Sequence, residues 1–318
     1  MADCVVRLQN VVKRFAGHTA VRNLSADVPR GGIFGLLGPN GAGKTTTIRM
    51  IMNVITPDSG RIELFGGQPA SRALTSRIGF LPEERGLYKK MRVLDHLVFF
   101  AEIKGLTPRD ARARSRAWLE RLGLQDWTTH KVEDLSKGMQ QKVQFIGALL
   151  HDPELLVLDE PFSGLDPVNS QVMKDVVVEL AREGRTILFS THIMEQAERM
   201  CDRIVIIARG EKIVDGRIAD VKREFGGSYV ALSFGHDAER AGAVLRDRAL
   251  VAQVDDYGVS AEVRLAEGAE PDQLLSRLVN AGVGLLRFEV VEPSLNSIFI
   301  AKVGADAAVA RAEEVALA

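Results

Sequence analysis

A glycine-rich segment ahead of Lys44 has the spacing of a loop that binds phosphate groups. It reads GPNGAGKT, fits the pattern GxxxxGK[ST], and follows the apolar run IFGLL directly. Glycines let backbone N–H groups curl around phosphates, and the N-terminus of a following helix adds a favourable dipole. The lysine reaches the β- and γ-phosphates of a nucleotide, and the Thr45 hydroxyl is suited to Mg²⁺. The residues predicted to bind nucleotide are Gly38, Pro39, Asn40, Gly41, Ala42, Gly43, Lys44, Thr45 and Thr46.

A pair of carboxylates ends a second apolar run. Leu155–Leu158 is followed by Asp159 and Glu160, and ligands of open α/β sheets bind at the carboxyl ends of the strands. We predict that Asp159 holds Mg²⁺, mainly through water, and that Glu160 is the general base that polarises the attacking water. Neither motif distinguishes adenine from guanine, but the chain has no NKxD-like segment to recognise guanine, which disfavours a GTPase.

The segment LSKGMQQ, about twenty residues ahead of the carboxylate pair, resembles the LSGGQ signature of the ABC (ATP-binding cassette) family. The resemblance covers residues 5 to about 220. A serine that caps a helix, followed by a glycine that permits close approach, suits a γ-phosphate. The resemblance implies that Ser136 and Gly138 contact ATP bound to a second subunit.

Three further segments match the family in its order along the chain. Ser163–Asp166 matches the D-loop, which lines the dimer contact, and STH at 190–192 matches the switch that places His192 on the γ-phosphate. Phe15, in KRFAG, occupies the position of an aromatic ring stacked on adenine. The implied catalytic residues are therefore Lys44, Glu160 and His192.

Two positions depart from the family pattern. Glu83, in LPEERGLY, stands where most members carry a glutamine that touches Mg²⁺, so it is a third candidate metal ligand beside Thr45 and Asp159. In the signature, Lys137 and Met139 replace glycine and glutamine. The segments PEERGLY, LSKGMQQK and VEPSLNSIFI together are similar to those of exporter ATPases that carry an extra C-terminal domain.

The elements that position these residues alternate between strand and helix. Apolar runs at 155–158, 186–190 and 204–208 predict a buried parallel sheet, so the fold class is α/β. We expect a P-loop NTPase core of the ABC type at 1–222, with short β-runs at 5–37 and a helical subdomain at about 91–150. Residues 228–302 read as βαββαβ, a small ferredoxin-like α+β domain, and 303–318 as a tail.

The composition leaves few other classes open. The 318 residues carry 41 Lys and Arg against 42 Asp and Glu, so no net field attracts nucleic acid, and we expect no nucleic-acid partner. The five arginines of Arg109–Arg121 fit the solvated face of an amphipathic helix better than an RNA or lipid contact. We find neither a signal-peptide pattern nor an apolar run of about 20 residues. Cys4 and Cys201 have no metal or redox spacing.

The resemblance implies an ATP-hydrolysing subunit of an ABC transporter that uses ATP and Mg²⁺. Such a subunit drives transport through a separate membrane permease by ATP-dependent, head-to-tail dimerisation with a copy of itself or a paralogous ABC subunit. We expect it in the cytoplasm, peripheral on the inner face of the cell membrane. The alternative is a soluble ABC ATPase with a non-transport role, although the two cassettes or long coiled coil typical of such proteins are not seen.

Overall fold

The computed structural model describes residues 4–84, 86–225, 229–236 and 238–303. The chain divides into two compact units between Arg217 and Ile218. This division places helix α7 (Ile218–Glu224) with the second unit, whereas the sequence-based end of the first domain, at residue 222, falls within that helix.

The sheet that carries the site has six strands in the order β10-β9-β3-β8-β7-β6. All neighbouring strands are parallel except β10, which runs antiparallel to β9. Every residue of β7 and β8 is buried, as expected for a parallel sheet covered on both faces. The strands are β3 (Gly32–Leu37), β6 (Ile78–Leu81), β7 (Leu155–Asp159), β8 (Thr186–Thr191), β9 (Arg203–Ala208) and β10 (Glu211–Arg217).

A second sheet has the order β2-β1-β4-β5. Its strands are β1 (Cys4–Phe15), β2 (His18–Pro29), β4 (Ser59–Leu64) and β5 (Gln68–Pro69). The expectation of short runs at 5–37 was wrong for β1 and β2, which are 12 residues each. Register shifts in their pairing let these long strands bend. Ile48 and Ile51 of α1 (Lys44–Ile51) belong to a core that contains residues of both sheets.

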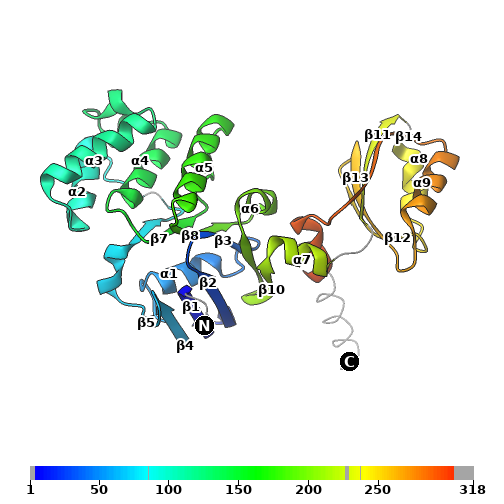
Figure 1. Cartoon of the computed structure of the whole chain (residues 1–318), viewed down its shortest axis with the longest axis horizontal. Helices are drawn as coiled ribbons and strands as arrows, with labels where there is room; N and C mark the ends of the chain where they lie inside the picture. Colours follow the sequence, from blue (N-terminus) through cyan, green and yellow to red (C-terminus); the bar gives the residue numbers. More distant parts are fainter. Residues whose placement is uncertain (1–3, 85, 226–228, 237, 304–318) are drawn as a thin grey trace. The chain divides into compact units, whose positions relative to one another are not determined.

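The helical region predicted between 91 and 150 contains α2 (Val93–Ile103), α3 (Pro108–Arg121) and α4 (Lys137–Leu149), which Figure 1 shows grouped together. Ala111, Ser115 and Leu119 of α3 are buried, while its five arginines are exposed, as the amphipathic pattern predicted. The remaining elements of this unit are α5 (Pro167–Arg182), α6 (Met194–Met200) and the short 3-10 helices Arg72–Arg77, Gln125–Trp127 and Val132–Asp134.

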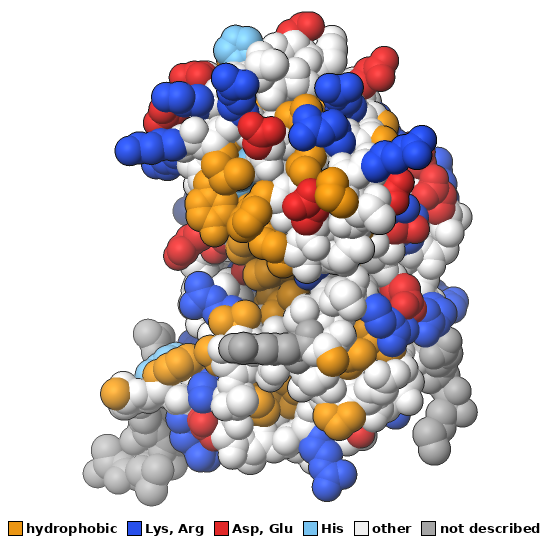
Figure 2. Space-filling model, turned by 90° about the vertical axis from the view of Figure 1, so that its left-hand side faces the viewer, with side chains coloured by type: hydrophobic (Ala, Val, Ile, Leu, Met, Phe, Trp, Pro, Cys, Tyr) orange, Lys and Arg blue, Asp and Glu red, His pale blue; other side chains and the backbone are white. Residues whose placement is uncertain are grey.

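An aromatic patch lies on the exposed side of α2 and on the loop before it. We define the α2 patch as Tyr88, Phe99, Phe100 and Ile103, whose three rings contact one another. Tyr88 is 53% exposed and Ile103 61%. Figure 2 shows the side of the molecule on which hydrophobic side chains gather in the upper half. Beneath the patch, the ring of His96 is buried against Phe100.

The second unit is an antiparallel sheet in the order β12-β13-β11-β14. Its elements are β11 (Tyr229–His236), α8 (Ala238–Leu245), β12 (Val251–Asp256), β13 (Ser260–Leu265), α9 (Pro271–Asn280) and β14 (Gly284–Val291). This is the predicted βαββαβ order, and Figure 1 shows α8 and α9 on the same side of the sheet. A helix at 295–303 follows. Of the predicted tail, 304–318 lie outside the described residues.

Among the described residues, we find no helix with the length and apolar character that crossing a membrane requires.

Candidate functional site

The loop between β3 and α1 is shaped by close backbone approaches. Gly43 precedes the helix with φ +104°. A Cβ atom on Gly43 would lie 2.4 Å from the carbonyl oxygen of Ala20, and one on Gly38 would lie 2.1 Å from that of Ile207. Both glycines also have positive φ, which side chains of L-residues disfavour. The loop therefore needs glycine at these positions to pack against β2 and β9.

A cavity of about 470 Å³ opens above this loop. The structure brings predicted site residues from four separate segments to its wall, namely the strand end at Phe15, the glycine-rich loop, Glu83 and Glu160. His18 and Ala20 at the start of β2 also line it, and no feature of the sequence had pointed to them. The lining residues are Phe15, His18, Ala20, Asn40, Gly41, Ala42, Gly43, Lys44, Thr45, Thr46, Glu83 and Glu160.

The ammonium group of Lys44 is folded back onto the loop. Its Nζ donates to the carbonyl oxygens of Gly38 at 2.8 Å and Pro39 at 3.2 Å, and lies 3.8 Å from Glu160 Oε1. Burial lowers the pKa of Lys44, and the nearby Glu160, Asp159 and Glu83 carboxylates oppose that shift. Lys44 thus places a cation at the wall of the cavity.

Asp159 ends β7 in a fully buried position. Ser190 Oγ donates to its Oδ1 at 2.8 Å, and the Thr45 hydroxyl also hydrogen-bonds to it. Burial raises the pKa of Asp159, while the hydrogen bonds from Ser190 and Thr45 and the charge of Lys44 lower it. The paired oxygens of Thr45 and Asp159 are the hard donors that Mg²⁺ takes. Among the described residues no three Asp, Glu, His or Cys side chains cluster as a metal site.

Glu160 follows the last residue of β7 and has φ +49°, a left-handed backbone conformation that ends the extended strand. Its backbone N–H donates to Ser190 O at 3.0 Å. Its Oε1 lies 2.8 Å from His192 Nδ1, and its Oε2 accepts from Thr191 Oγ1 at 3.2 Å. The carboxylate is thus held by the end of β8, because β7 pairs with β8 in register, Asp159 opposite Ser190.

The signature segment lies apart from this cavity. Ser136 is exposed and caps α4, where its Oγ accepts from Met139 N at 3.2 Å. Ser136 and Gly138 do not line the 470 Å³ cavity. A Cβ atom on Gly138 would make only ordinary contacts, the nearest at 3.5 Å to Leu165. The packing of its own chain therefore does not require glycine at this position.

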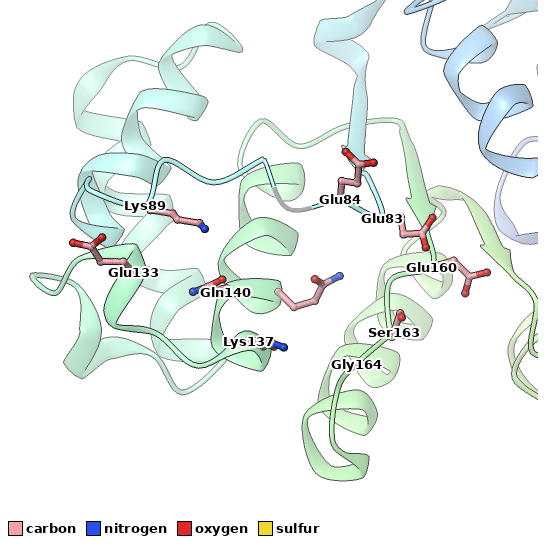
Figure 3. A pocket seen from close by; sticks show the side chains of 10 residues that line it. Glu83, Glu84, Lys89, Glu133, Lys137, Gln140, Glu160, Ser163 and Gly164 are labelled. Atoms are coloured by element: carbon pink, nitrogen blue, oxygen red, sulfur yellow. The ribbon is translucent and has the colours of Figure 1, made fainter. Parts of the chain in front are cut away.

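A second cavity of about 760 Å³ lies between the helical region and the loops after β6 and β7, as Figure 3 shows. Glu83 and Glu160 line both cavities, so the two meet at these carboxylates. Lys137 and Gln140 come from α4, and Ser163 and Gly164 from the predicted D-loop. Three more residues, Glu84, Lys89 and Glu133, complete the labelled lining.

Comparison with known proteins agrees with this geometry. Residues 21–163 match the family described as ABC transporter, and residues 216–303 match the ATP-binding protein DrrA1-3-like C-terminal domain. The chain is 42% identical to the uncharacterised ABC transporter ATP-binding protein YhaQ of Bacillus subtilis, over 95% of this chain and 99% of that protein. It belongs to the ABC transporter ATP-binding proteins.

Other ABC relatives span most of both chains. Identity is 33% to the linearmycin resistance ATP-binding protein LnrL of B. subtilis, over 93% of this chain and 97% of that one. The chain is 36% identical to the Nod factor export ATP-binding protein I of Burkholderia orbicola, over 96% of this chain and 98% of that protein. A solved ATP-binding subunit of an ABC transporter superposes with TM-score 0.65 at 32% identity, covering 70% of this chain and 93% of that one. The structure of cbiO1 of Clostridium perfringens, part of the ABC transporter complex cbiONQ, superposes with TM-score 0.60 at 28% identity. The match covers 70% of this chain and 94% of that one.

These findings confirm the predicted family, the ABC ATPase fold, ATP binding and ATPase activity. The structure adds contacts of two glutamines of this ABC subunit to which the motifs had assigned no role. Gln141 of α4 donates to Pro161 O at 3.1 Å, and Gln144 donates to Pro82 O at 3.3 Å and Glu84 O at 3.2 Å. The signature helix is therefore bonded to the backbone on both sides of Glu83 and just after Glu160.

Proposed function

We propose that this ABC ATPase drives transport through a separate membrane permease by closing head to tail on a second cassette around two ATP molecules. The observation that carries the proposal is the position of Ser136 and Gly138. Both are outside the cavity that holds the chain's own glycine-rich loop, and Gly138 is a glycine that its own chain does not need. A second chain approaching α4 would use both residues, because its bound ATP could reach Ser136 and the exposed N-terminus of the helix.

The catalytic roles follow from the contacts in the site. Lys44 would exchange the carbonyl oxygens of Gly38 and Pro39 for the β- and γ-phosphates. Thr45 and Asp159, with Glu83 at the cavity wall, would hold Mg²⁺, which neutralises phosphate charge when bound. Glu160 would accept a proton from the attacking water, and His192, now 2.8 Å from it, would keep that carboxylate in place and reach the γ-phosphate. Phe15, which is 50% exposed at the cavity, would stack on adenine.

The α2 patch supports a membrane partner. A contiguous patch of exposed aromatic side chains is typical of a protein interface. The segment that bears Tyr88 follows Glu83 in the sequence. A permease segment bound to the α2 patch would contact the loop that carries Glu83, a residue that lines both cavities. We therefore place the subunit at the cytoplasmic face of a membrane, bound through its permease. The name of the Nod factor export ATP-binding protein I favours export as the direction.

Mixing two inactive variants tests the shared site. Lys44→Ala removes the lysine from the chain's own loop, and Gly138→Asp blocks the signature offered to the partner. Each variant alone should be inactive with Mg²⁺ and ATP. In a mixed dimer, one site combines the intact loop of one chain with the intact signature of the other, so an equal mixture should recover about a quarter of the wild-type rate.

The matched control mixes Lys44→Ala with Glu160→Gln. Both residues belong to the same half of the proposed site, so no mixed dimer contains an intact site and activity should stay lost. The proposal is wrong if the first mixture recovers nothing, or if the control mixture recovers as much.

A further inference from the structure

The last strand of the C-terminal sheet, β14, lies at an edge of that sheet. β14 pairs with β11 on one side, and among the described residues no strand lies on its other side. Leu286 is 77% exposed and Val290 59%. An open edge with exposed apolar side chains is a template for another strand.

The sequence of β14 is complementary to a second, antiparallel copy of the same strand. The strand reads GLLRFEVV, and Phe288 stands between Arg287 and Glu289. Turned antiparallel about Phe288, each Arg287 faces a Glu289 and each Leu286 faces a Val290. We propose that β14 pairs with β14 of a second copy of this chain about a two-fold axis at Phe288, which joins two four-stranded sheets into one.

The charges select this register. Arg287 Nε donates to Glu289 Oε2 at 2.8 Å, so both groups lie on the same face of the strand. Pairing about Phe288 adds a cross-strand Arg–Glu contact at each side, and such pairs stabilise a sheet. Pairing centred on Arg287 or on Glu289 would instead place a charge opposite its own copy. Each such like pair is destabilising.

Two structural details limit the contact. The pairing of β14 with β11 shifts between Ser233 and Phe234, so the regular stretch begins at Arg287 and the interface is short. The opposite edge of the sheet is less suited to pairing, because Arg248 Nη1 donates to Ala252 O on β12 at 2.9 Å. We therefore expect one weak, specific contact. The β14–β14 contact needs no nucleotide. It therefore goes beyond the proposed ATP-dependent closure, and dimerisation through β14 can be measured separately in the absence of ATP.

Charge reversal in the full-length chain tests the pairing. Sedimentation equilibrium without nucleotide, from about 5 to about 500 µM, covers the range expected of a small interface. The wild type should dimerise. Arg287→Glu and Glu289→Arg should each weaken the dimer at least about tenfold, because both cross-strand pairs become repulsive. Arg277→Glu, which reverses an exposed charge on α9 and leaves β14 itself unchanged, is the matched control and should dimerise like the wild type.

Mixing distinguishes lost pairing from lost folding. Arg287→Glu and Glu289→Arg chains have opposite charges at both positions, so an equal mixture should form heterodimers with about wild-type affinity. The double variant that exchanges the two residues should also dimerise. A wild type that stays monomeric up to the highest concentration would leave the edge to a segment of another protein and overturn the proposal. So would a dimer that both reversals leave intact, or single variants that neither mixing nor the exchange restores.

Discussion

Replacement of Gly43 by alanine should destabilise the ATP-binding unit far more than the same change two residues earlier. At Gly43 the backbone has φ +104°, and an added Cβ would lie 2.4 Å from Ala20 O, a backbone atom that cannot rotate away. Backbone strain of about 1–2 kcal/mol adds to a packing cost of about 1–3 kcal/mol. The expected loss is therefore about 2–5 kcal/mol.

Gly41 is the matched control, because it shares the loop and a positive φ of +79° but has nothing within 4 Å of an added Cβ. Gly41→Ala should lose only the strain, about 1–2 kcal/mol. Urea unfolding of the nucleotide-free proteins gives both values, and the transition of the ATP-binding unit is the one that shifts when ATP is added to the wild type. Equal losses for the two variants would refute the claim that contact with β2 fixes the glycine.

Three further predictions concern titratable groups. Lys44→Ala should lose most ATP affinity because it removes the cation facing the phosphates; equal affinities in titration calorimetry would contradict the assignment. Asp159→Asn should raise the Mg²⁺ concentration needed for half-maximal ATPase activity, and an unchanged requirement would remove Asp159 from the metal site. Burial lowers the pKa of His96 to about 4, so the folded state resists its protonation, and up to about 3 kcal/mol of stability present above pH 6.5 is lost as the pH falls towards 4. His96→Phe should make the difference in unfolding free energy between pH 7 and pH 5 smaller, as measured by urea unfolding. Part of the difference should remain, because burial also lowers the pKa of His151. An unchanged difference would contradict the assignment to His96.

The sequence indicated the elements that carry strong periodicity or a motif. The apolar runs that became β7, β8 and β9 were recognisable because strands buried on both faces are apolar throughout. The βαββαβ order of the second unit was also predicted, since its strands and helices alternate clearly. Segments without such a signal were missed, including β4 and β6, and the helix at 295–303.

Site residues were predictable in type but not in their contacts. Motif spacing placed Lys44, Glu83 and Glu160 in one site, and all three line one cavity. That Lys44 folds onto Gly38 O, or that Glu160 bonds to His192, depends on the pairing of β7 with β8 and on local backbone angles that sequence patterns do not specify. The contacts of Gln141 and Gln144 on α4 were not predicted, because their partners are backbone carbonyls, which leave no trace in the sequence.

The most direct test of ATP-driven closure is the Glu160→Gln variant. Glutamine keeps the size of the side chain but removes the basic carboxylate, so phosphate release should fall by about 100- to 10,000-fold while ATP still binds. Because Lys44 and the partner's signature would still grip the γ-phosphate, the variant should gain a dimer in light scattering on addition of ATP and Mg²⁺, beyond any association seen without nucleotide. The wild type should gain less. A variant that hydrolyses ATP at the wild-type rate, or that gains no dimer when saturated with ATP, would contradict the account.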